Sequence, residues 1–273
     1  MPKVLVNQLA VHYQQQGKGQ DIVLIHGVTG NLSVWFINIL PALIKKYRVT
    51  AYDLRGHGYS DRPRSGYTSD DMVVDLKGLV DHLQIKRAFF VGHSFGGAIA
   101  LHFASLYPQQ TAGVVVLDAG IPALLHLRRL DDWKGWDLYK DDLDRLGVHT
   151  EEELVDVENA VRKSFYVPVQ HGLRAGGSRQ SDRLTSLIEE TSILKEFRLV
   201  KGLTEEKISH IACPTLGVYG AFSPYRGIGE RMKEIMPHCE FLSVPGHGHF
   251  YPMQSPGVVV ELLDTFFQKQ NTE

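Results

Sequence analysis

Short apolar runs recur along this chain, and turn-forming residues separate them. Near the N-terminus, residues 3–7 and 10–15 alternate apolar and polar side chains, which is typical of strands with one buried face. The later runs are almost continuously apolar, as in strands of a parallel sheet that is covered on both faces. These later runs are 22–25, 48–52, 88–91, 113–117, 215–219 and 240–244.

Stretches with a helical spacing of apolar residues lie between these strands. They are 32–45, 70–83, 95–106, 226–236 and 256–268. Strands that alternate with helices predict an α/β fold, with a mostly parallel, doubly wound sheet and helices on both of its faces. We therefore expect an α/β core built from residues 1–120 and 207–273.

The stretch 121–206 breaks this alternation, because it holds helical patterns and no strong strand pattern. The helical patterns and the glycine-rich piece between them are 150–164, 181–195 and 172–177. Such an insertion predicts a helical cap, or lid, over the carboxyl ends of the strands, where open α/β sheets bind ligands. Its aromatic residues include Trp133 and Trp136, which we expect to bind a small, mostly apolar substrate. A second domain with no role at the site is the alternative.

Composition narrows the classes of function. The chain has 273 residues, with 29 Lys and Arg against 31 Asp and Glu, so its formal net charge is −2 and no nucleic-acid partner is expected. The two cysteines, Cys213 and Cys239, form no C-x-x-C pair, which argues against a zinc knuckle or a redox motif. The sequence shows no signal peptide and no membrane span, so we expect a cytoplasmic monomer or homodimer that acts on a small molecule.

The strongest chemical signal is Gly92-His93-Ser94-Phe95-Gly96. This G-x-S-x-G motif follows a buried strand pattern and precedes a helix of small residues, which is the context that a nucleophile elbow requires. Glycine on either side lets the strand and the helix approach while Ser94 turns its hydroxyl out of the sheet. Ser94 is therefore the predicted nucleophile.

With this motif the chain resembles the α/β-hydrolase superfamily, and the resemblance covers nearly the whole chain apart from the insertion. It is similar in layout to the cap-bearing epoxide hydrolases, haloalkane dehalogenases and meta-cleavage-product hydrolases. A second matching motif, His26-Gly27, ends the strand 22–25. The resemblance implies that the backbone N–H groups of Val28 and Phe95 form the oxyanion hole. A tight strand exit without such a role is the alternative for His26-Gly27.

A third match, DLRGHGYS at residues 53–60, resembles the D-x-R-G-x-G-x-S turn of cap-bearing members. We expect a structural role here, in which Asp53 and Arg55 tie loops together.

The predicted catalytic histidine lies in Pro245-Gly246-His247-Gly248-His249-Phe250. The resemblance implies a Gly-His pair seven residues before a proline, and Pro256 then selects His249. His247 is the weaker candidate. Alternating histidines also suggest a metal site, but no Asp or Cys ligands accompany them, so we expect no metal.

The third member of the triad departs from the family's pattern. Most relatives carry an Asp in a G-x-x-D pattern after the strand that corresponds to 215–219, where this chain has Ser223. The substitute is Asp118, which follows the strand 113–117, since some relatives carry their acid at the end of that strand. The alternative for Asp118 is a carboxylate that merely caps the first turn of the lid.

A serine nucleophile excludes the chemistry of dehalogenases and epoxide hydrolases, which displace groups at saturated carbon with an Asp. A serine that a histidine activates attacks an acyl carbon and forms an acyl-enzyme. The sequence therefore predicts a cofactor-free serine hydrolase that acts on an ester, a lactone, a thioester or the ketone of a C–C bond. Two alternatives remain, both raised by the missing acid at Ser223: a receptor-like ligand-binding protein, and a lyase or cyclase on the same fold.

Overall fold

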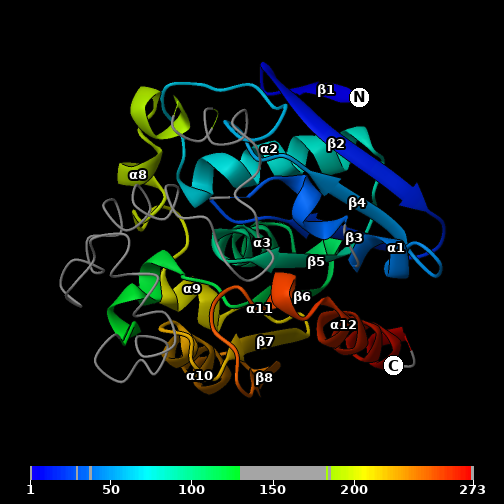
Figure 1. Ribbon diagram of the computed structural model, residues 1–273, viewed down its shortest axis with the longest axis vertical. Helices are drawn as coiled ribbons and strands as arrows, with labels where there is room; N and C mark the ends of the chain where they lie inside the picture. The colour runs from blue at the N-terminus through cyan, green and yellow to red at the C-terminus, as the bar shows by residue number, and fades with distance from the viewer. Residues whose placement is uncertain (1, 29, 37–38, 130–182, 184–185, 272–273) are drawn as a thin grey trace.

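The computed structural model describes residues 2–28, 30–36, 39–129, 183 and 186–271. Its centre is an eight-stranded sheet with the order β1-β2-β4-β3-β5-β6-β7-β8, which runs across the molecule from β1 to β8 in Figure 1. The strands are β1 (Lys3–Val6), β2 (Leu9–Gly17), β3 (Asp21–Ile25), β4 (Arg48–Tyr52), β5 (Ala88–His93), β6 (Thr111–Leu117), β7 (Thr215–Gly220) and β8 (Cys239–Val244).

The pairing explains the two kinds of apolar pattern. β2 pairs antiparallel with both β1 and β4, whereas every pair from β4 through β8 is parallel. β3 and β5 are buried along their whole length, while β1 alternates exposed and buried residues. The predicted α/β fold, with a mostly parallel sheet, is confirmed. In a parallel sheet all carboxyl ends lie at one edge, so the loops after β3 to β8 meet there.

Helices cover both faces of the sheet, and two apolar cores result. The helices are α1 (Ile39–Leu43), α2 (Ser69–His82), α3 (Phe95–Leu106), α8 (Ile193–Glu196), α9 (Glu205–Ser209), α10 (Arg226–Ile235), α11 (Tyr251–Gln254) and α12 (Pro256–Asn271). One core joins α2, α3 and α10 to the sheet, and the other joins α1 and α12. Neighbouring residues of β5 divide between the two, since Phe90 lies in the first core and Phe89 in the second.

Two predicted helices are interrupted. The helix expected at 32–45 is divided into the 3-10 helix η1 (Leu32–Trp35) and the short α1, which contains Pro41. The helix expected at 181–195 is interrupted between residues 186–190 and α8. The backbone N–H of Ser192 donates to the carbonyl of Arg64 there, at 2.9 Å, instead of continuing the helix. Tertiary contacts therefore override the local helical pattern.

Most of the predicted cap lies outside the described residues. Trp133, Trp136 and the helical pattern at 150–164 all fall there, so their expected roles stay predictions. The described part of 121–206 begins with the 3-10 helix η3 (Pro122–Leu127) and returns through residues 186–206. On its return the carboxylate of Glu196 accepts the backbone N–H groups of Gly66 and Tyr67, at 2.8 and 2.6 Å. This contact fixes the end of the insertion to the loop before α2.

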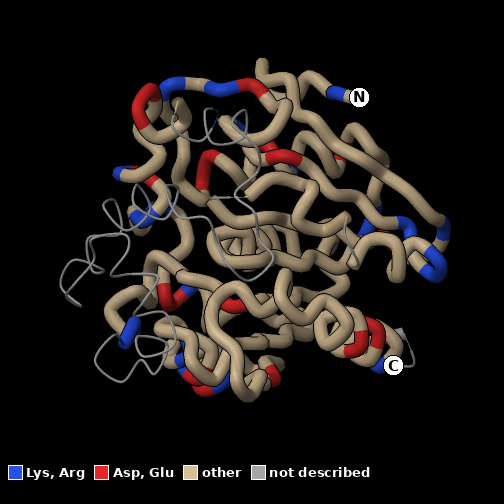
Figure 2. Tube along the Cα trace, in the orientation of Figure 1, with Lys and Arg blue, Asp and Glu red and all other residues tan. Residues whose placement is uncertain are grey.

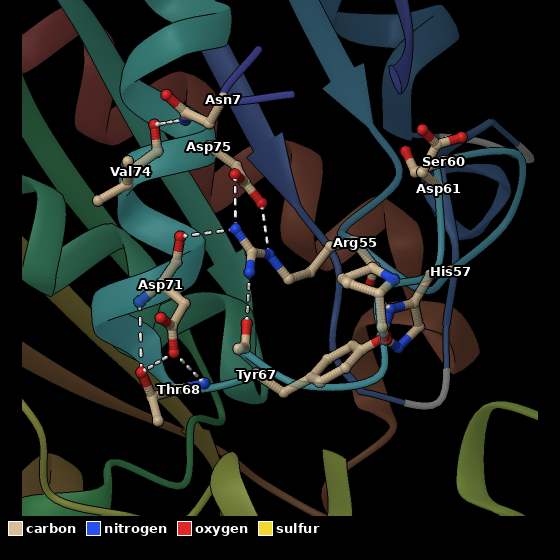
Figure 3. A network of polar contacts seen from close by, with 12 residues as sticks. Asn7, Arg55, His57, Ser60, Asp61, Tyr67, Thr68, Asp71, Val74 and Asp75 are labelled. Atoms are coloured by element: carbon tan, nitrogen blue, oxygen red, sulfur yellow. Dashed lines mark hydrogen bonds and ion pairs between the residues drawn. The ribbon is translucent and has the colours of Figure 1, made fainter. Parts of the chain in front are cut away.

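The turn after β4 ties loops together, as the sequence predicts. Asp53 accepts the backbone N–H groups of Leu32 and Tyr59, at 2.8 and 2.9 Å. Figure 3 shows Arg55 reaching α2, where its guanidinium donates to both carboxylate oxygens of Asp75, at 2.6 and 2.7 Å. A third nitrogen of Arg55 donates to the carbonyl of Gly66 at 2.7 Å. These paired charges hold the turn in one conformation at the edge of the sheet.

The two signs of charge are mixed along the chain. Figure 2 shows Lys and Arg interspersed with Asp and Glu over the described trace. No described helix is long and apolar enough to cross a membrane.

Candidate active site

Ser94 lies in a sharp turn between β5 and α3. Its backbone has φ 54° and ψ −129°, a conformation that side-chain-bearing residues rarely adopt and that functional sites often retain. At the flanking glycines, Gly92 and Gly96, there is no room for a side chain. A Cβ on Gly92 would lie 2.1 Å from the carbonyl oxygen of Gly96, and one on Gly96 would lie 2.3 Å from that of Ile25. The strand–turn–helix context inferred from the sequence is therefore present.

Ser94, His249 and Asp118 form a continuous chain of hydrogen bonds. His249 Nδ1 lies 2.9 Å from Asp118 Oδ1, and His249 Nε2 lies 3.1 Å from Ser94 Oγ. A carboxylate only accepts, so Nδ1 carries the proton and Nε2 is left to accept the Ser94 hydroxyl proton. The Asp118 side chain is completely buried, whereas that of His249 is 18% exposed. This arrangement can transfer a proton from Ser94 to His249 beside a fixed negative charge.

The surroundings of Asp118 hold its carboxylate in place. Its backbone has φ 50°, so the turn directs the side chain toward the loop after β7. The N–H of Gly220 donates to Asp118 Oδ2 at 2.7 Å, and the hydroxyl of Ser223 donates to Oδ1. Two tyrosines near it, Tyr219 and Tyr251, have pKa values raised well above 10, first by burial and then by the Asp118 charge. The carboxylate thus lies in an interior that water does not screen.

His247 lies in the same loop as His249 but points elsewhere. Its Nδ1 donates to the carbonyl of Pro245 and its Nε2 accepts the hydroxyl of Ser255, each at 2.7 Å. Both ring nitrogens are therefore engaged away from Ser94. The loop also passes close to the end of β7, since a Cβ on Gly220 would lie 2.4 Å from the His247 carbonyl oxygen.

The loop that carries Val28, one of the two residues predicted for the oxyanion hole, lies beside Ser94. The carbonyl of Gly27 accepts both His26 Nδ1–H and the N–H of Gly30, at 2.7 and 3.0 Å. Because a trans peptide directs its N–H opposite to its carbonyl, the Val28 N–H points away from those two donors. A Cβ on Gly27 would lie 2.7 Å from the Ser94 Cβ, so this loop is adjacent to the nucleophile.

The second predicted donor belongs to the first residue of α3. The first N–H groups of a helix have no carbonyl partner within it, so the N–H of Phe95 is available beside Ser94. In the loop that carries Val28, burial and the neighbouring His57 lower the pKa of His26 to about 3. His26 is therefore neutral, and its Nε2 accepts the N–H of Leu54 at 3.0 Å.

Sequence reasoning missed His93, the residue before the nucleophile. Its buried ring donates Nε2–H to the backbone carbonyl of His249 at 3.0 Å, and the two ring centroids are 5.0 Å apart. Burial, and then the proximity of His249, lower the pKa of His93 to about 4. The one available signal was its position in the motif, which places it beside Ser94 without indicating a partner.

The part of the chain that the structure describes contains no group of three or more His, Cys, Asp or Glu residues suited to a metal ion.

A family model described as the alpha/beta hydrolase fold matches residues 22–255. The chain belongs to the alpha/beta-hydrolase family. Among curated proteins, a 2-(acetamidomethylene)succinate hydrolase of Mesorhizobium japonicum is 25% identical in an alignment that covers 97% of this chain and 94% of the relative. The comparisons therefore support a hydrolase of this family.

Solved structures agree on the fold. The meta-cleavage product hydrolase CumD of Pseudomonas fluorescens matches with a TM-score of 0.70 and 22% identity, over 98% of each chain. The epoxide hydrolase CorEH matches with a TM-score of 0.71 and 23% identity, also over 98% of each chain. The resemblance in layout to these two kinds of enzyme, expected from the sequence, is confirmed.

Proposed function

We propose that this hydrolase is a serine hydrolase that acts through an acyl-enzyme, with Ser94 as nucleophile, His249 as general base and acid, and Asp118 as the acid that orients the histidine. The observation that carries the proposal is the unbroken chain of hydrogen bonds from Ser94 Oγ through His249 to Asp118 Oδ1. In a triad the carboxylate keeps the imidazole in the correct tautomer and stabilises the imidazolium that forms.

The reaction proceeds in two halves. Ser94 Oγ attacks the acyl carbon as its proton passes to His249 Nε2, and the N–H groups of Val28 and Phe95 stabilise the oxyanion. His249 then returns the proton to the leaving group, and the bond between that group and the acyl carbon breaks. A water molecule that His249 deprotonates attacks the acyl-enzyme, which releases the carboxylic acid and restores the Ser94 hydroxyl.

The substrate is a small molecule with an ester, lactone, thioester or C–C ketone bond. The relatives named as a 2-(acetamidomethylene)succinate hydrolase and a meta-cleavage product hydrolase support a small organic substrate. The receptor-like and lyase alternatives were motivated by the missing acid at Ser223. The hydrogen bond between Asp118 and His249 supports the hydrolase over both alternatives, because it gives the imidazole a carboxylate partner.

The test is covalent labelling of the nucleophile. A short-chain p-nitrophenyl ester should release a burst of chromophore, and a fluorophosphonate should label Ser94, as peptide mass spectrometry would show. Ser94→Ala should lower kcat by about 10⁶-fold while the protein still folds, because the triad acts as a unit. Ser243→Ala, at an exposed serine of β8, is the matched control. Near-native hydrolysis by Ser94→Ala would refute the proposal.

A further inference from the structure

Ser223 stands at the family's usual acid position and contacts the carboxylate that replaces that acid. Its side chain is buried, and its hydroxyl donates to Asp118 Oδ1. The same oxygen accepts the Nδ1–H of His249 at 2.9 Å. The neutral residue and the catalytic histidine therefore share one acceptor atom.

The other contacts of Ser223 leave Asp118 as the acceptor of its hydroxyl proton. Its oxygen accepts the N–H of Tyr225 at 3.1 Å, and its own backbone N–H donates to the carbonyl of Gly220 at 3.0 Å. A carboxylate offers no proton of its own, so the hydroxyl proton lies on the bond to Asp118. With the Gly220 N–H on Oδ2, three donors surround a carboxylate that water does not reach.

We propose that Ser223 is a positioning residue of the active site, which acts on His249 through Asp118. The proposal rests on the triad proposed above. The Ser223 hydroxyl holds Asp118 Oδ1 in line with His249 Nδ1. Its hydrogen bond also stabilises part of the negative charge on Asp118, which weakens the electrostatic effect of that charge on His249. Both effects follow from a charge-assisted hydrogen bond on the shared oxygen.

The loop that carries Ser223 is fixed to the loop that carries His249. The N–H of Ala221 donates to the carbonyl of Val244, and that of Phe222 donates to the carbonyl of His247, each at 2.9 Å. Position 223 consequently keeps its place relative to the imidazole when the side chain changes. A carboxylate at 223 would occupy the neighbourhood of Asp118 Oδ1 and could serve His249 from there.

The described titratable groups that lie against His249 or that the Asp118 charge affects have pKa values displaced from the neutral range. Among the described residues, two titratable rings lie against that of His249: His93, whose pKa burial lowers to about 4, and Tyr225, whose pKa burial raises. Tyr219 and Tyr251 near Asp118 have pKa values raised well above 10. A change of kcat/KM near neutral pH therefore does not arise from these four groups.

The first test compares Ser223→Ala with Ser243→Ala on a p-nitrophenyl ester across pH. Loss of a hydrogen bond to a charged group should lower the plateau kcat of Ser223→Ala about tenfold and leave KM nearly unchanged. Without this hydrogen bond the Asp118 charge favours the protonated form of the imidazole more strongly, so the acidic limb of kcat/KM should move to higher pH. The far-downfield proton resonance of His249 Nδ1–H should shift as well.

The second test relocates the acid. Asp118→Asn combined with Ser223→Asp should recover kcat at least tenfold over Asp118→Asn alone. A Ser223→Ala profile that matches Ser243→Ala, or a lower rate with an unmoved acidic limb and Nδ1–H resonance, would overturn the proposal. If Asp118→Asn alone keeps native kcat, the triad itself is wrong. If instead Asp118→Asn loses activity and Ser223→Ala does not, the triad stands and only the proposal for Ser223 is overturned.

Discussion

The carboxyl ends of β5 and β6 lie side by side, yet their functional residues are held in opposite ways. Each strand is followed directly by a non-glycine residue at positive φ, Ser94 at 54° and Asp118 at 50°. The turn at Ser94 depends on its near neighbours Gly92 and Gly96, whose lack of a side chain allows the close approach of strand and helix. Asp118 is fixed by Gly220, Ser223 and His249, which are 102, 105 and 131 residues away in the sequence. A local motif therefore reveals the nucleophile, while only the folded chain reveals what surrounds the acid.

The largest effect should come from the histidine that joins these two strand ends. His249→Ala removes the only described group that bonds to both Ser94 and Asp118, so we expect kcat to fall by about 10⁶-fold. His247→Ala leaves that chain intact and should lower kcat less than tenfold. Steady-state hydrolysis of a p-nitrophenyl ester measures both variants. If the His247 variant were the inactive one, the assignment from the spacing to Pro256 would be wrong.

The second effect distinguishes two buried carboxylates that follow strands of the sheet, Asp118 after β6 and Asp53 after β4. Asp118→Asn keeps the shape but offers the imidazole an amide and no charge, so kcat should fall by about 10³- to 10⁴-fold with KM little changed. Asp53→Asn, after β4, replaces one of the two carboxylate oxygens that accept the N–H groups of Leu32 and Tyr59. One of these bonds is then lost, so this variant should instead lower the unfolding midpoint. Thermal unfolding and kinetics on both variants make the comparison. Equal kcat losses in the two variants would remove the special role of Asp118.

The sequence was sufficient wherever a pattern is local. Apolar patterns predicted all eight strands, with alternating residues for β1 and β2 and nearly continuous apolar runs for the others. The predicted helix at 95–106 has the observed bounds. The glycines around Ser94 and the Gly-His spacing selected residues that the fold brings together. Asp118 was selected because Ser223 could not supply a charge and because some relatives carry their acid at the end of the corresponding strand.

Features that depend on distant contacts were not predictable in the same way. No local pattern indicates that Ser192 bonds to Arg64, so the helix break before α8 was missed. The role of His93 was missed for the same reason, since its partner carbonyl lies 156 residues away. Ser223 was interpreted as the absence of an acid, because a sequence does not show which carboxylate its hydroxyl meets.

The smallest effect should come from His93, which joins the locally fixed elbow to the distant His249 loop. His93→Phe keeps a ring but loses the donor to the His249 carbonyl, so kcat should fall about threefold to tenfold. His93→Gln retains an N–H donor and should recover part of that loss. His238→Gln, at an exposed position, is the control. A His93→Phe enzyme with native kcat would show that the elbow does not position the catalytic loop.

The lowered pKa of His93 predicts how the free energy of unfolding depends on pH. Burial lowers the pKa of His93 from 6.5 to about 4, so the unfolded chain binds this proton more readily than the folded protein. The contribution of His93 to the free energy of unfolding is therefore fully present above about pH 6.5 and is lost as pH falls toward 4. In urea unfolding at pH 7.5 and pH 5, His93→Gln should lose less free energy of unfolding between the two values than the native chain does. His26, with a pKa of about 3, contributes in the same direction and remains in the variant, so part of the acid sensitivity should persist. Equal losses in the two proteins would mean that His93 does not hold its neutral form in the fold.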